Sequence, residues 1–239
     1  MIIHPKDWKK NYEELAQRGN KNFITVVEII DVLKDVISDI NVNHLAYSGG
    51  IDSTILLCLM SKIFNEVHTY SVASRKEHKD LYFARIGSKI YGSVHHEFVV
   101  KPTAVETDEF PGDNAVRQLF ECVSKFTNKI ICGDGIDEFM CGYYKHMDLK
   151  FDTYFYFLSQ LLPAHLIPLS RGSGSIKVYL PYLDDKLISI TKNIPLLFKV
   201  DTATRKKVMV DIAKYLNINQ DIISRNKYGF VDAFIEKNK

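Results

Sequence analysis

Two segments of this sequence combine glycine with hydroxyl and carboxylate side chains in a way that suits phosphate chemistry. The first is Ser48-Gly49-Gly50-Ile51-Asp52-Ser53-Thr54. Its two glycines let the backbone approach an anion closely, and a helix that starts here would add free amide groups and the positive end of its dipole. Asp52 would repel a phosphate, so we expect it to hold a Mg²⁺ ion that bridges phosphate oxygens. A glycine turn that only caps a helix is the alternative.

The second segment runs from Cys132 to Tyr143 and reads Cys-Gly-Asp-Gly-Ile-Asp-Glu-Phe-Met-Cys-Gly-Tyr. It places three carboxylates, those of Asp134, Asp137 and Glu138, around a glycine turn. Like charges this close destabilise one another unless a cation lies between them. A purely structural role as a helix cap remains open for Glu138.

Both segments follow predicted strands. From residue 43 onward, short apolar strands alternate with helices, which predicts a parallel sheet with helices on both faces and a ligand site beyond the carboxyl ends of the strands. The expected strands are His44 to Tyr47, Val67 to Val72, Val94 to Val100 and Lys129 to Cys132, and the expected helices are Ser53 to Phe64, Lys79 to Tyr91 and Asn114 to Phe126. We divide the chain into a helical lead-in (1–42), an α/β core (43–142) and a mostly helical part (143–239) that completes the site.

Composition narrows the class of protein. The 239 residues carry a formal net charge of +2, which does not favour nucleic-acid binding. The sequence shows neither a signal-peptide pattern nor an apolar run long enough to span a membrane, so a cytoplasmic location is expected. The four cysteines lack zinc-site spacing. His95 and His96 are adjacent on a predicted strand and would point to opposite faces, so they should not share a metal ion.

The first segment resembles the PP-loop, with the pattern Ser-Gly-Gly-x-Asp-Ser, of enzymes that split ATP between the α and β phosphates. It is not a Walker loop, because no Gly-x-x-x-x-Gly-Lys-Ser/Thr occurs. The resemblance implies a PP-loop (adenine nucleotide α-hydrolase-like) fold and ATP chemistry, and it leaves the acceptor open.

Further motifs between His44 and Phe230 resemble the synthetase domain of the asparagine synthetase family. They include the acidic loop at 132–143, Pro181-Tyr182-Leu183-Asp184, Arg205-Lys206-Lys207 and the segment from Arg225 to Phe230. The resemblance implies Mg²⁺ at Asp52 and Asp137, proton acceptance from the amine by Asp134, and stabilisation of negative charge by Lys206. It implies contacts with ATP from the PP-loop residues Ser48, Gly49, Gly50, Asp52, Ser53 and Thr54, and also from Ala46, Val72, Gly133, Arg225 and Lys227.

Two departures from the family pattern matter. Only 43 residues precede the first strand, too few for the glutaminase domain of glutamine-dependent members, so we expect ammonia or an amine as the nitrogen donor, with a separate glutaminase subunit as a possible partner. Lys177 and Tyr179 replace a carboxylate and an arginine on the acceptor side. The expected activity is Mg²⁺- and ATP-dependent amide formation through an acyl-adenylate.

Two alternatives to this activity stay open. The chain could resemble β-lactam synthetase or the lasso-peptide cyclases, which join a carboxylate to an internal amine, and the changed acceptor residues favour this reading. It could instead be a nucleotide-binding subunit of a separate amidotransferase. A PP-loop enzyme that modifies tRNA is less favoured, because neither a basic domain nor a zinc cluster is evident.

Overall fold

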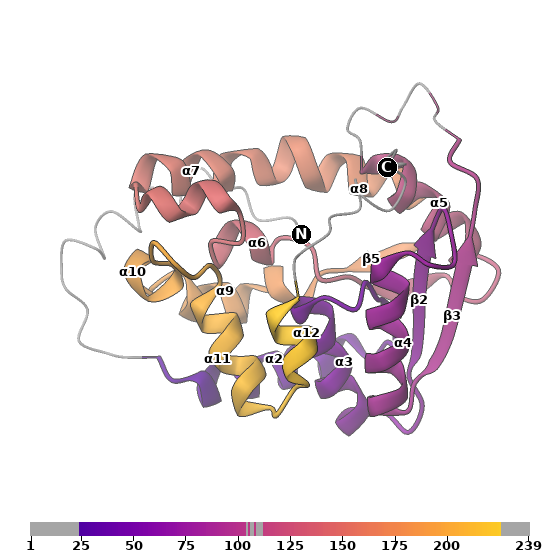
Figure 1. The fold of residues 1–239 in the computed structure, drawn as a ribbon, viewed down its shortest axis with the longest axis horizontal. Coiled ribbons are helices and arrows are strands. Elements are labelled where there is room, and N and C mark those ends of the chain that lie inside the picture. Colours follow the sequence, from indigo (N-terminus) through magenta and orange to yellow (C-terminus); the bar gives the residue numbers. More distant parts are fainter. Residues whose placement is uncertain (1–23, 104, 106–107, 109–111, 226–239) are drawn as a thin grey trace.

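A five-stranded parallel sheet with helices packed around it forms the fold of the computed structural model (Figure 1), which describes residues 24–103, 105, 108 and 112–225. The strand order is β3-β2-β1-β4-β5. The strands are β1 (His44–Ala46), β2 (His68–Ala73), β3 (Val94–Val99), β4 (Lys129–Ile131) and β5 (Lys177–Tyr179). Each neighbouring pair runs parallel. The predicted parallel sheet is therefore confirmed, and β5 is an addition to it.

Helices cover both faces of this sheet, as the alternation along β2 demonstrates. The Thr69 hydroxyl lies 3.0 Å from the Ser93 hydroxyl, just beyond α4 (Lys79–Tyr91). The next residue, Tyr70, has its ring 5.8 Å from that of Phe126, just beyond α5 (Asp113–Val123). Successive strand residues point to opposite faces, so α4 and α5 lie on opposite sides of the sheet.

The helix α2 (Val26–Ile40) begins at a capping box formed by Thr25 and Glu28. Thr25 Oγ1 accepts a hydrogen bond from the Glu28 backbone, and the Glu28 carboxylate accepts one from the Thr25 backbone. The buried apolar residues of α2 recur at helical spacing. The helix packs against α3 (Ile51–Ile63), α9 (Asp185–Thr191) and α11 (Lys207–Tyr215). This helix is the part of the predicted lead-in that falls within the described residues.

The segment after residue 142 is mostly helical, as expected, but it also supplies β5 at the edge of the sheet. One hydrophobic core runs without a break from α2 to α12 and includes residues from both sides of the proposed boundary at 142/143. The remaining helices are α6 (Ile136–Phe139), η1 (Tyr144–Asp148), α7 (Phe151–Gln160), η2 (Leu161–Leu166), α8 (Ile167–Gly172), η3 (Pro181–Leu183), α10 (Leu196–Lys199) and α12 (Gln220–Ser224).

Within the described ranges, no helix combines the length and the apolar character that crossing a membrane requires. His95 and His96 do point to opposite faces. The His95 ring meets Tyr47 on one face, and the His96 ring stacks on Tyr70 on the other.

A lysine is fully buried in the helical part. The Nζ atom of Lys199 donates to the Tyr154 hydroxyl at 2.9 Å and lies 4.9 Å from the centre of that ring. Burial lowers the pKa of Lys199 from about 10.5 to about 8, and the nearby Cys141 thiol opposes this shift only in part. The folded state therefore binds the Lys199 proton less tightly than the unfolded chain does.

Between pH 8 and pH 10.5 the unfolded chain carries more of this proton, so the contribution of Lys199 to the free energy of unfolding rises with pH. We expect the free energy of unfolding of Lys199→Met at pH 7 to equal that of the wild type or to exceed it by up to about 3 kcal/mol. This advantage should shrink as the pH approaches 10. Urea unfolding at several pH values tests it, with Lys62→Met on an exposed part of α3 as a control for the lost charge. A stability difference that does not vary with pH would contradict the prediction.

Candidate active site

The PP-loop segment turns sharply between β1 and α3. Gly49 has a φ of +67°, and a Cβ atom at this position would lie 2.4 Å from the backbone nitrogen of Ala84 in α4, so only glycine fits. The Ser48 hydroxyl lies 3.2 Å from the Ser53 hydroxyl and accepts a hydrogen bond from the Gly50 backbone at 3.3 Å. The loop is thus held against α4 with its hydroxyl groups together at the start of α3.

Thr54 lies behind the loop. Its side chain is fully buried, and its hydroxyl lies 3.1 Å from the hydroxyl of Tyr47. This hydroxyl ties α3 to the end of β1, a role that the sequence motif alone does not indicate.

The two acidic glycine loops meet at one lysine. Lys206 Nζ lies 2.5 Å from Asp52 Oδ2 and 2.5 Å from Asp137 Oδ1. Lys206 is the N-cap residue of α11 and has a left-handed backbone with a φ of +53°. At Gly142, a Cβ atom would lie within 1.7 Å of Asp137 Oδ1 and 2.5 Å of Lys206 Cε, so a larger residue there would disrupt the cluster.

The electrostatic balance of this cluster favours an additional cation. Burial by itself lowers the pKa of Lys206, but the carboxylates of Asp137 and Asp52 outweigh burial and raise that pKa above its ordinary value. Two carboxylates against one ammonium group leave one negative charge in excess. The Oδ1 atom of Asp52 is buried and has no hydrogen-bond partner among the described residues.

These residues fit a Mg²⁺ ion, which prefers oxygen ligands and is commonly held by one or two carboxylates together with substrate phosphates. Asp52 and Asp137 would be the protein ligands. The described part of the chain contains no group of three or more His, Cys, Asp or Glu residues arranged for a metal. Phosphate oxygens would therefore have to complete the coordination.

A cavity of about 480 Å³ opens beside this cluster, and three cations border it. Arg205 donates to the Gly142 carbonyl at 2.6 Å and stacks on the Tyr144 ring, with its guanidinium carbon 3.7 Å from the ring centre. Arg225 and Lys206 supply the other two positive charges. Asp52 and the PP-loop residues Ser48 and Gly50 also border the cavity, so the space lies between this glycine loop and basic side chains.

Arg225 also fastens the loop itself. Its guanidinium donates to Asp80 Oδ1 at 2.7 Å and to the Ser48 carbonyl at 3.3 Å, and its side chain is only 4% exposed. Arg225 thus has a structural role at the loop, and its contact with phosphate stays a prediction. Lys227, the other predicted cation, lies outside the described residues.

Two contacts that position the loop were not anticipated from the sequence. The hydroxyl of Tyr182 donates to the Asp52 carbonyl at 2.8 Å, although 130 residues separate them. Asp80 pairs with Arg225 across 145 residues. Tyr182 belongs to the Pro-Tyr-Leu-Asp motif, which the sequence singled out without a role, whereas Asp80 carried no signal.

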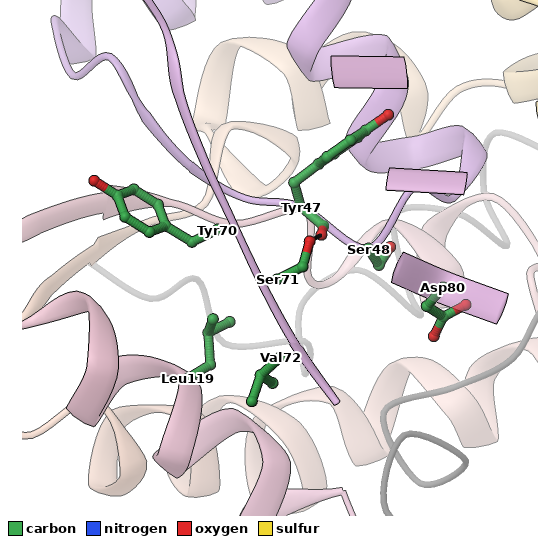
Figure 2. A pocket seen from close by; sticks show the side chains of 7 residues that line it. All are labelled: Tyr47, Ser48, Tyr70, Ser71, Val72, Asp80 and Leu119. Atoms are coloured by element: carbon green, nitrogen blue, oxygen red, sulfur yellow. Dashed lines mark hydrogen bonds between the residues drawn. The ribbon is translucent and has the colours of Figure 1, made fainter. Parts of the chain in front are cut away.

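The other predicted positions lie around this centre. Val72 and Ser48 line a hollow of about 10 Å³, enough for one water molecule, beside Ser71, Asp80 and Leu119 (Figure 2). Ala46 is the last residue of β1 and pairs with Tyr70. A Cβ atom at Gly133 would lie 3.9 Å from the Asp52 Cβ, so the two loops are in contact. Asp134 lies in the turn between β4 and α6 and is not among the residues that line the 480 Å³ cavity.

The family model described as Asparagine synthase matches residues 38–167, more than half of the chain, including the PP-loop and the acidic loop. The chain belongs to the asparagine synthase family. This family comprises ATP-using, amide-forming synthetases. The match ends before Pro181, so Lys206 and Arg225 lie beyond the matched part of the asparagine synthase model.

One curated relative is a protein of Methanocaldococcus jannaschii named "Putative asparagine synthetase (glutamine-hydrolyzing) 2", which is 25% identical over 158 residues. The match covers 59% of this chain and 30% of that protein, so the chain spans less than a third of this asparagine synthetase relative. Among solved structures, NMN synthetase from Francisella tularensis is similar, with a TM-score of 0.47 and 13% identity. That match covers 96% of this chain and 77% of the other.

Proposed function

We propose that this chain is an ATP-dependent ligase that forms amides through an acyl-adenylate. The observation that carries the proposal is the convergence of Asp52, Asp137 and Lys206 beside the PP-loop, at the edge of a basic cavity. Such a cluster suits a triphosphate with its metal, because it combines oxygen ligands for Mg²⁺ with cations for phosphate oxygens. Membership of the asparagine synthase family supports the same reaction class.

In the proposed reaction, an oxygen of the substrate carboxylate attacks the α phosphorus and the bond to the β phosphate breaks, so pyrophosphate leaves. An amine or ammonia then attacks the acyl carbon, AMP departs, and the amine gives a proton to Asp134. Lys206 would stabilise the negative charge that develops on phosphate oxygens, and Arg205 and Arg225 would hold the leaving pyrophosphate. Mg²⁺ bound by Asp52 and Asp137 would supply charge neutralisation on the phosphates.

A cyclase of β-lactam-synthetase type stays a second candidate, because two residues on the expected acceptor side differ from the family pattern. Lys177 and Tyr179 lie in β5, and the Cys132 backbone at the start of the acidic loop donates to the Tyr179 carbonyl at 2.9 Å. Tyr179, one of the two residues that differ from the family pattern, thus lies directly beside the proposed catalytic loop, whereas Lys177 is opposite Lys129 at the start of β4. A screen of carboxylates, with and without internal amines, for ATP-dependent pyrophosphate release separates the two candidates. If none of the acids elicits pyrophosphate release by the isolated chain, the nucleotide-binding subunit is favoured instead.

We expect the purified chain to use ammonium or a primary amine and to leave glutamine intact. Hydrolysis of glutamine by a cysteine needs a reactive thiolate. Burial raises the pKa of Cys122, of Cys132 and, to about 12, of Cys141, and Cys58 is buried. Pyrophosphate release and glutamate formation should be measured in parallel, with ammonium and then with glutamine as nitrogen donor. Glutamate formed by the chain alone would overturn this prediction without affecting the proposed adenylation.

A further inference from the structure

Three histidines lie together on the α5 side of the sheet, away from the PP-loop. His44 and His68 open β1 and β2, where they are register partners, and His96 lies in β3. The ring centres of His44 and His68 are 4.9 Å apart, and those of His68 and His96 are 5.7 Å apart. The PP-loop lies at the opposite, carboxyl end of these strands, roughly 15 Å away for a strand of this length. This cluster is therefore separate from the proposed ATP site.

The ring nitrogens of two of these histidines face one another. His68 Nδ1 lies 3.4 Å from His96 Nε2, while His68 Nε2 lies 2.9 Å from a carboxylate oxygen of Glu66. If Glu66 accepts the Nε2 proton, Nδ1 keeps its lone pair and directs it toward His96. A carboxylate that orients a histidine in this way is the usual second layer of a metal-binding imidazole.

The spacing also suits a metal ion. Two nitrogens that each lie about 2.0–2.1 Å from a tetrahedral Zn²⁺ are roughly 3.4 Å apart. His44 is not one of the ligands, because its Nδ1 lies 2.8 Å from the Tyr70 hydroxyl, but its ring covers one side of His68.

We propose that His68 and His96 form a binding site for a transition-metal cation of the Zn²⁺ type, with Glu66 orienting His68. The two imidazoles leave further coordination positions to water. The ion would connect β2 to the edge strand β3 and so stabilise the sheet at the end remote from ATP. Because imidazole is a poor ligand for Mg²⁺, the site is chemically distinct from the carboxylates of Asp52 and Asp137.

The test uses the full chain without a histidine tag, at pH 7.5 with millimolar Mg²⁺ present and no ATP. Zn²⁺ added to a concentration about 100-fold above its Kd should raise the Tm by several degrees, because a ligand that binds only the folded state stabilises it. One Zn²⁺ per chain should remain bound after gel filtration. The electron paramagnetic resonance spectrum of bound Cu²⁺ should show hyperfine coupling to two imidazole nitrogens.

His96→Gln and His68→Gln should each lose the Zn²⁺-induced Tm shift, whereas His95→Gln, the neighbour on the opposite face, should keep it. The metal-induced shift is compared within each variant, so a change in basal stability does not obscure the result. A wild-type chain that binds no Zn²⁺, or an equal shift in His96→Gln, would mean that the two rings form only a hydrogen bond. Neither result depends on whether the chain is a ligase.

Discussion

Asp52→Asn and Asp137→Asn should each reduce pyrophosphate release by a factor on the order of 10³ or more while leaving the fold intact. Each change removes one of the two carboxylates that we propose hold Mg²⁺, and the loss of a charge that acts on the transferring phosphates has effects of this size. The fold should survive, because the wild-type cluster carries one excess negative charge and either substitution removes it.

Two measurements check this prediction. Pyrophosphate release is followed with Mg²⁺, ATP and a carboxylate that the wild type accepts, and the Tm is measured with and without Mg²⁺-ATP. Both asparagine variants should lose most of the Tm increase caused by Mg²⁺-ATP, whereas Asp201→Asn, which removes a carboxylate that pairs with Lys207, should behave as the wild type. A wild-type rate of pyrophosphate release in either Asp52→Asn or Asp137→Asn would show that the substituted carboxylate is not a required Mg²⁺ ligand.

Lys206→Ala is expected to slow turnover about a hundredfold, equivalent to on the order of 3 kcal/mol of barrier, with ATP affinity nearly unchanged. The reason is that its ammonium group would stabilise charge that develops only in the transition state. The ion pairs add a second expectation. Without Lys206, Asp52 and Asp137 lie side by side and uncompensated, so the variant should be destabilised in EDTA and should regain more stability on addition of Mg²⁺ than the wild type does.

Lys207→Ala is the matched control for this prediction. Lys207 Nζ lies 3.0 Å from Asp201 and 3.3 Å from the Leu197 carbonyl, outside the acidic cluster, and such partly exposed ion pairs contribute about 0–1 kcal/mol to stability. Its turnover should equal that of the wild type. Single-turnover measurement of pyrophosphate release decides between the two lysines. A loss of turnover confined to Lys207→Ala would show that Lys207, and not Lys206, has the catalytic role. Unchanged turnover in both variants would show that neither lysine takes part in the reaction.

The features that the sequence predicted correctly depend on local pattern. A short apolar run, two glycines and a helical apolar face follow one another between residues 44 and 63, and β1, the loop and α3 form there within two residues of the expected limits. Strands β2, β3 and β4 likewise begin and end close to their predicted residues. Each of these elements carries its own periodicity, so neighbouring residues suffice to indicate it.

The fifth strand, β5, could not be predicted from local pattern. Lys177–Tyr179 is only three residues long, too short for an alternation of apolar and polar side chains to stand out, and it follows a long helical stretch. It becomes a strand because β4 offers a free edge, with Ile130 opposite Val178. The pairing partner lies 48 residues earlier in the chain, so the segment itself carries no sign of it.

By itself the sequence determined the parallel α/β architecture, the family, and the two glycine-rich segments whose residues meet at the candidate site. Only the tertiary structure decided which atoms meet. Lys206, which has a left-handed backbone at the start of α11, contacts Asp52 across 154 residues. The Tyr182 contact with the loop and the pairing of His68 with His96 likewise depend on how separate elements pack. Periodicity reports which face of an element is buried, but the partner of that face is set by packing against residues distant in the chain.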